Sequence, residues 1–124
     1  MLTNESASAL YADYVEGWKP VSDTERTTIA NRVIAPSATY ATPNHASGNR
    51  ATIVADMVAF QAKFPGGHFD VGDVSAHHDV ALLTWILVKA DGTEVARGHD
   101  QIRVANDQIV DLITFAPSKL RDER

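Results

Sequence analysis

The stretch RGHDQIRVANDQIVDLITF (Arg97–Phe115) has the pattern of two β-strands joined by a tight turn at Asn106 and Asp107. Side chains alternate between the two faces of a strand. In the first strand, which begins near Glu94, one face therefore carries Arg97, His99, Gln101 and Arg103. The opposite face carries Ala96, Gly98, Asp100, Ile102 and Val104. A single carboxylate, Asp100, thus stands in an otherwise apolar face, and we expect that face to turn toward the interior.

Working outward from this hairpin, the second half of the chain predicts a meander of antiparallel strands. The strands are expected near His68–Ala76, Val80–Lys89, Glu94–Ala105 and Gln108–Phe115. The sequence ADG at Ala90–Gly92 supplies the turn between the second and third of them. The strand near Val80–Lys89 is apolar on both faces, so we expect it to lie centrally in the sheet and to be covered on both sides.

The first half of the chain predicts three helices, because apolar residues recur there at steps of three and four. Pro20 ends the first helix, and Ser22 with Glu25 has the spacing of a capping box that starts the second. The third helix runs from about Asn49 to Phe64 and is ended by the PGG sequence that follows. The buried stripes are expected to be Leu10, Tyr14 and Trp18, with Tyr11 and Val15 beside them, in the first helix, Ile29, Val33 and Ile34 in the second, and Ile53, Met57, Phe60 and Phe64 in the third.

A short strand at Ala38–Thr42 and a loop at Pro43–Gly48 connect the second helix to the third. Helices followed by an antiparallel meander predict an α+β fold, in which three helices pack on the concave face of a curved, mostly antiparallel sheet. The outer face of this sheet combines the polar row of the strand at Glu94–Ala105 with apolar residues of its neighbour. A mixed face of this kind suits the interface of a homodimer. The alternative is the solvated face of a monomer.

The length of 124 residues suits one domain, with an ordered core over about residues 5–116 and a charged tail, Ser118–Arg124, that frays. The net charge of −5, without a basic cluster, argues against a nucleic-acid partner. The chain has no cysteine and no basic-then-apolar signal at its N-terminus. The longest apolar run, Val80–Val88, is far shorter than the roughly 20 residues of a membrane-spanning helix. We therefore expect a cytoplasmic protein without a membrane partner.

Four stretches carry a family resemblance: Tyr11–Trp18, SATYATPNHASG (Ser37–Gly48), FQAKFPG (Phe60–Gly66) and Arg97–Phe115. With the order of helices and strands, they resemble the SnoaL-like group, named for a polyketide cyclase, of the nuclear transport factor 2-like superfamily. The resemblance covers nearly the whole chain, and its diffuse pattern specifies the fold far better than the activity. It implies a cone-shaped sheet curled around a cavity that the helices close and that opens at one end.

The resemblance also implies residue roles. The cyclases and the related ketosteroid isomerase use a carboxylate on the strand where Asp100 falls. In the cyclases this acid is implied to shuttle a proton during an intramolecular aldol closure, and in the isomerase it stays protonated and donates a hydrogen bond. The tyrosine on the first helix of the isomerase is matched best by Tyr11, with Tyr14 one turn later. At the position of the isomerase's general base this chain has Thr42. Double-bond isomerisation by the isomerase's route needs a carboxylate there, so Thr42 departs from the family pattern.

Asp100 is also the strongest catalytic candidate when the family resemblance is left aside. A carboxyl group that faces an apolar cavity is poorly solvated, so its neutral form is favoured and its pKa rises. A raised pKa brings the group toward the range in which it both accepts and donates protons near neutral pH. The alternative is a structural buried acid, hydrogen-bonded to a tyrosine, the backbone or water.

Further candidates surround Asp100 in the predicted arrangement. Tyr11 and Tyr14 are the other catalytic candidates, because a phenol hydroxyl is able to hydrogen-bond the acid or a ligand oxygen. The residues expected to bind substrate are Trp18, Tyr40, His45, Met57, Phe60, Phe64, Trp85, Ile102 and Asp111. For the aromatic and aliphatic members the alternative is plain core packing, and for His45 it is an ordinary solvent-exposed loop histidine.

Asp111 is ambiguous from the sequence alone. If Ile109 faces inward, strict alternation makes Asp111 a second acid in or near the cavity; if Val110, Leu112 and Thr114 face inward, Asp111 forms a salt bridge with an arginine outside.

No HxH or HExxH spacing points to a metal, and no glycine-rich loop precedes a helix for a nucleotide. We therefore expect neither a metal nor a cofactor.

Three functions remain open at this point. The first is a small enzyme, a cyclase, isomerase, dehydratase or hydrolase, that transfers protons through Asp100 on a small apolar molecule carrying oxygen. The second is a carrier or sensor that only binds such a ligand in the same cavity. The third is a dimeric interaction module with a filled interior. A fold alone does not decide between them.

Overall fold

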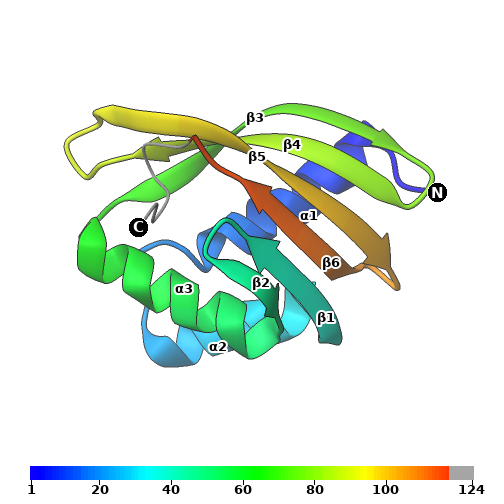
Figure 1. Cartoon of the computed structure of the whole chain (residues 1–124), viewed down its shortest axis with the longest axis horizontal. Coiled ribbons are helices and arrows are strands. Elements are labelled where there is room, and N and C mark those ends of the chain that lie inside the picture. Colours follow the sequence, from blue (N-terminus) through cyan, green and yellow to red (C-terminus); the bar gives the residue numbers. More distant parts are fainter. Residues whose placement is uncertain (118–124) are drawn as a thin grey trace.

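The computed structural model describes residues 1–117. Within this range three helices and six strands follow one another (Figure 1): α1 (Asn4–Glu16), α2 (Asp23–Val33), β1 (Ile34–Thr42), β2 (His45–Gly48), α3 (Arg50–Lys63), β3 (His68–His77), β4 (Val80–Val88), β5 (Glu94–Ala105) and β6 (Gln108–Phe115). The strands form a single sheet in the order β2-β1-β6-β5-β4-β3. β1 and β6 run parallel, and every other neighbouring pair is antiparallel.

The three helices lie on one side of the curved sheet, as Figure 1 shows. α1 packs against β3, α3 packs against β1, and α2 packs against α1. The predicted α+β fold with helices covering one face of a mostly antiparallel sheet is confirmed. β4 lies between β3 and β5 inside the sheet, as its apolar sequence predicts.

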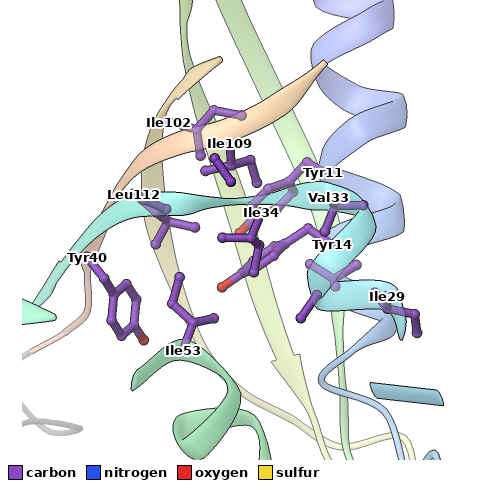
Figure 2. Close-up of a cluster of buried hydrophobic side chains, with 14 of the residues drawn as sticks. Tyr11, Tyr14, Ile29, Val33, Ile34, Tyr40, Ile53, Ile102, Ile109 and Leu112 are labelled. Carbon is purple, nitrogen blue, oxygen red and sulfur yellow. The ribbon is translucent and has the colours of Figure 1, made fainter. Parts of the chain in front are cut away.

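The alternation predicted for β5 is confirmed. Ala96, Gly98, Asp100 and Ile102 are buried, whereas Arg97, His99, Gln101 and Arg103 are exposed. Figure 2 shows how the inward residues meet the helices: Ile102 of β5 lies above side chains from β1, β6, α1, α2 and α3 in one continuous core. Asp100 therefore lies on the face of the sheet that the helices cover.

The connection between α2 and α3 differs from the prediction. The first strand begins at Ile34, directly after α2, so Ile34 belongs to β1 and not to the stripe of the helix. The expected loop at Pro43–Gly48 contains a short strand, β2, which pairs back on β1. The physical reason is a tight turn: the Thr42 hydroxyl accepts hydrogen bonds from the backbone N–H groups of Asn44 and His45, each at 3.1 Å.

α1 also ends earlier than predicted. Its last residue is Glu16, and Gly17 caps it, so Trp18 stands beyond the helix. The residues of α1 that are buried are Ala7, Tyr11, Tyr14 and Val15, whereas Leu10 is only half-buried. Tyr14 of the predicted stripe is buried, as are Tyr11 and Val15 beside it, and both tyrosines point into the core (Figure 2).

A buried arginine holds the connection between α1 and α2. The Arg26 guanidinium donates hydrogen bonds to the backbone carbonyls of Gly17, Lys19 and Val21 at 3.0–3.2 Å and pairs with Asp23. These carbonyls follow the end of α1 and would otherwise lack partners in the helix. Arg26 therefore fixes the segment that carries Trp18 toward the sheet.

The predicted charged tail at Ser118–Arg124 lies outside the described residues. No helix within residues 1–117 is long and apolar enough to cross a membrane.

Candidate functional site

A cavity of about 240 Å³ lies between the helices and the inner face of the sheet. Nine of the predicted site residues line it: Tyr11, Tyr14, Trp18, Tyr40, His45, Phe60, Phe64, Trp85 and Asp100. They come from α1, β1, β2, α3, β4, β5 and two connecting segments. Aromatic rings form much of the wall, and the Phe69 ring of β3 packs on Trp18, Phe60 and Trp85 at centroid distances of 4.6–5.5 Å. The cavity is therefore mostly apolar, with a small number of polar side chains.

Asp100 and Tyr11 form the inner polar group of this cavity. The Tyr11 hydroxyl donates a hydrogen bond of 2.6 Å to Asp100 Oδ2, and only 4% of the Asp100 surface is exposed. Asp100 Oδ1 and Trp85 Nε1 are both buried and have no hydrogen-bond partner of normal geometry among the described residues.

Burial raises the pKa of the Asp100 carboxyl from its ordinary value to about 6, because removal from water disfavours the charged form. The hydrogen bond from Tyr11 and the nearby Thr114 and Trp85 side chains act in the opposite direction and lower this pKa. Burial likewise raises the pKa of the Tyr11 and Tyr14 hydroxyls, and the Asp100 charge raises them further. Both phenols therefore stay neutral donors when Asp100 changes its protonation state.

A second set of polar side chains, Tyr40, His45 and Asp56, forms the outer polar group of the cavity. The Tyr40 hydroxyl donates a hydrogen bond of 2.7 Å to Asp56 Oδ2, and His45 Nε2 lies 3.1 Å from Asp56 Oδ1. The side chains of His45 and Asp56 are 37% and 27% exposed, so this group lies where the cavity meets solvent. The cavity thus has a carboxylate at its inner end and another at its outer end.

Asp56 is a site residue that sequence reasoning missed. Its position held a signal, because Asp56 lies three residues after Ile53 and four before Phe60, on the stripe of α3 that faces the interior. A carboxylate at a core-facing helical position is as unexpected as Asp100 on its strand. The same spacing argument, applied to α3, would have identified it.

Three predicted site residues do not line the cavity. Met57 and Ile102 are fully buried members of the hydrophobic core, so they support the wall from behind. Asp111 accepts a hydrogen bond from the Thr39 hydroxyl of the neighbouring strand and stays outside the cavity.

A register shift between β5 and β6 explains why strict alternation did not decide whether Asp111 faces the cavity. The pairing of β5 with β6 shifts between Arg103 and Val104, which places both Ile109 and Leu112 in the core although they are three residues apart. Asp111 then faces outward. Its predicted salt bridge with an arginine is absent from the described contacts, since Arg103 pairs with Asp79 instead.

The polar atoms of the cavity do not form a metal site of the usual kind. Among residues 1–117 no three histidine, aspartate or glutamate side chains gather closely enough to hold a metal ion. The inner and outer polar groups instead offer hydrogen-bond donors and acceptors to an organic molecule. Such an arrangement is suited to binding a small ligand and to moving its protons.

No protein-family model and no curated protein matches this sequence. Solved structures do match over nearly their whole length. A candidate isomerase of the SnoaL-like family from Agrobacterium tumefaciens aligns with a TM-score of 0.82 at 22% identity, over 92% of this chain and 99% of that one. IdmH, a candidate polyketide cyclase from Streptomyces antibioticus, aligns with a TM-score of 0.74 at 17% identity, over 90% and 92% of the two chains.

A nuclear transport factor 2-like protein of unknown function from Mesorhizobium loti also aligns, with a TM-score of 0.64 at 20% identity, over 93% of each chain. The chain therefore has the cone fold of the SnoaL-like and nuclear transport factor 2-like proteins, as the sequence resemblance implies. Proteins of this fold carry different names and functions, so the particular chemistry has to be argued from the two polar groups of the cavity.

Proposed function

We propose that this protein binds a small, mostly apolar molecule bearing oxygen in its cavity and performs acid–base chemistry on it through Asp100, without a cofactor. One observation carries the proposal: Asp100, a buried carboxyl whose pKa is raised to about 6, lines a mostly apolar cavity beside the Tyr11 hydroxyl. A ligand oxygen that reaches this carboxyl would share a proton with the acid. A carbonyl suits the protonated acid, and an enol or alcohol suits the carboxylate.

The environment of Asp100 supports a role in proton transfer. General acids and bases work best when their pKa lies near the working pH, and the pKa of Asp100 is raised to about 6. The Tyr11 hydroxyl holds one carboxyl oxygen in place with a hydrogen bond of 2.6 Å. The reaction classes that need such a group and no cofactor are cyclisation, isomerisation, dehydration and hydrolysis. The names of two structural neighbours, a candidate isomerase and a candidate polyketide cyclase, point in the same direction.

The test is to compare wild-type protein with Asp100→Asn on a panel of small aromatic ketones and alcohols, following turnover by NMR. We expect the wild type to convert or exchange at least one ketone, and Asp100→Asn to reduce the rate by about 100-fold or more. Near-UV circular dichroism would establish that the variant keeps its packing. Undiminished turnover in Asp100→Asn would contradict the proposed role.

A second candidate function is that of a ligand carrier or sensor, which the same cavity favours. In that case members of the panel bind and quench the fluorescence of Trp18 and Trp85, both of which line the cavity, yet none is consumed. Asp100→Asn would then change affinity modestly and nothing else. The third possibility raised by the sequence, an interaction module with a filled interior, is disfavoured by a cavity beside Asp100.

We also propose that the protein is a homodimer through the outer face of its sheet. Leu82 of β4 and Phe115 of β6 are 46% and 50% exposed there, beside the arginine-bearing face of β5. Exposed apolar side chains within a polar rim are typical of protein interfaces. The cytoplasmic location expected from the sequence stays a prediction.

A further inference from the structure

The outer polar group has a geometry that core packing does not require. Three different elements bring its members together: β1 supplies Tyr40, β2 supplies His45 and α3 supplies Asp56. Each Asp56 oxygen has one hydrogen-bond partner, the Tyr40 hydroxyl for Oδ2 and the His45 ring for Oδ1, so both ends of the carboxylate are held. A carboxylate held in this way orients the imidazole and keeps the ring proton on Nε2. Nδ1 is then the basic nitrogen, and none of the described contacts involves it.

His45 also supplies the only imidazole among the described side chains that line the cavity, and an imidazole is a common proton acceptor in enzymes. The phenols of Tyr11, Tyr14 and Tyr40 stay protonated, since burial raises the pKa of all three. Lys63 places its ammonium over the Phe64 ring, 5.7 Å from the centroid, and carries no free electron pair there. The Thr42 hydroxyl accepts two backbone hydrogen bonds in the turn before β2. Thr42 therefore positions His45 and does not act as a base.

The inner and outer polar groups belong to one electrostatic environment. The charges of Asp56 and Asp100 both raise the pKa of Tyr14, and both raise the pKa of Tyr40. Each tyrosine is therefore close enough to both carboxylates to respond to them. Figure 2 shows the Tyr14 and Tyr40 side chains, from α1 and β1, pointing into the same core. A ligand in this cavity would contact Asp100 at one end and His45 at the other.

We infer that His45, oriented by Asp56, is the catalytic base that works opposite Asp100 on an enolisable carbonyl compound. This inference rests on the proposed role of Asp100. His45 Nδ1 takes a proton from the carbon next to the carbonyl, and the C–H electron pair forms the new C=C bond. The carbonyl π pair moves to oxygen, which receives the proton of Asp100. The products are an enol, an imidazolium and a carboxylate, and no oxidant or reductant is needed. Asp56 is a positioning residue in this scheme.

The experiment uses 2-tetralone, a small apolar ketone with acidic C–H bonds, as the probe. Hydrogen–deuterium exchange at its α-carbon in D2O is followed by NMR, and its binding is followed by tryptophan fluorescence. We expect His45→Gln to slow exchange by about 100-fold with the dissociation constant changed less than about two-fold. Asp56→Asn should slow exchange by about ten-fold, again through the maximal rate rather than through binding. Free imidazole should restore exchange to His45→Ala, because the position is 37% exposed.

The chain offers a matched control. His68 pairs with Asp70 at the same Nε2–Oδ1 distance of 3.1 Å as the outer group, yet neither residue lines the cavity. His68→Gln should therefore leave exchange unchanged. If Asp100→Asn abolishes exchange while His45→Gln and Asp56→Asn retain it, the inference about His45 is overturned and the role of Asp100 stands. If the wild type exchanges neither 2-tetralone nor any other ketone of the panel, both are overturned.

Discussion

At the scale of single residues, Asp100 lowers the stability of the fold in a way that the proposed function explains. Its carboxyl is buried and receives one hydrogen bond of normal geometry, from the Tyr11 hydroxyl. Such a group costs free energy whenever it is charged, because too few hydrogen bonds replace its hydration. An amide of the same shape would avoid that cost. A residue that the fold would be better without is a strong sign of a functional site.

The first prediction concerns the pH dependence of this cost. The pKa of Asp100 is about 6 in the folded protein and about 4 in the unfolded chain, so the folded state binds more protons between these values. As far as Asp100 is concerned, the free energy of unfolding is therefore highest below about pH 4, decreases as the pH rises and reaches a lower plateau above about pH 6, where the buried carboxyl is charged. Two pKa units correspond to about 3 kcal/mol. Asp100→Asn should remove this dependence and be more stable than the wild type at pH 7.

Denaturant unfolding at pH 4.5, 5.5 and 7 measures this difference. Asp13→Asn on α1 is the control, since Asp13 is exposed and its replacement should leave the pH profile parallel to the wild type. A wild-type profile parallel to that of Asp100→Asn over the whole range would show that Asp100 stays ionised in the folded protein.

At the scale of elements, the connection between α1 and α2 depends on Arg26. Its guanidinium satisfies three backbone carbonyls and is buried. We predict that Arg26→Met lowers the free energy of unfolding by about 3 kcal/mol, because the carbonyls lose charged donors and the segment before α2 loosens. Arg32→Met on the same helix is the control, since Arg32 is exposed. Equal effects of the two substitutions on denaturant midpoints would refute a structural role for Arg26.

Gly98 controls how β5 packs on β4. A Cβ atom at this position would lie 2.1 Å from Trp85 Cζ2 and 2.4 Å from the Phe115 carbonyl oxygen. We predict that Gly98→Ala displaces the Trp85 indole from the cavity wall, lowers the melting temperature and weakens the binding of 2-tetralone. Overpacking of this kind typically costs about 1–3 kcal/mol.

Gly72→Ala on β3 is the matched control for Gly98→Ala. A Cβ atom there would have its closest contact, at 3.3 Å, with the Thr84 side chain, which leaves room for a small shift. Tryptophan fluorescence and thermal melts of both variants report the difference. Retention of the wild-type spectrum and affinity in Gly98→Ala would show that the indole does not depend on this glycine.

At the scale of the whole molecule, the cone has a covered inner face with a cavity and an outer face that is open in the monomer. The homodimer proposed through the outer face predicts that the wild type sediments as a dimer and that Leu82→Lys sediments as a monomer. Val58→Lys is the control, because Val58 is an apolar residue of α3 with a similar exposure of 47%. A wild type that remains monomeric at all accessible concentrations would refute the dimer.

The strand limits of the second half and the inward position of Asp100 could be predicted from the sequence. They follow from local rules, since alternation assigns faces within a regular strand and turn residues mark its ends. The same local rules failed where the backbone is irregular. The register shift between Ile109 and Asp111 turned Asp111 outward, the turn after Thr42 created β2, and Gly17 ended α1 before Trp18.

The sequence by itself determined the fold class, the covered face of the sheet and one buried acid, because each depends on neighbours along the chain. Only the tertiary structure brought His45, Asp56 and Tyr40 together, since these side chains come from three elements and meet through packing. It also decided that Tyr11, and not Tyr14, contacts Asp100. Which side chains share one cavity depends on the curvature of the sheet and the placement of the helices, and no spacing within a single element encodes either.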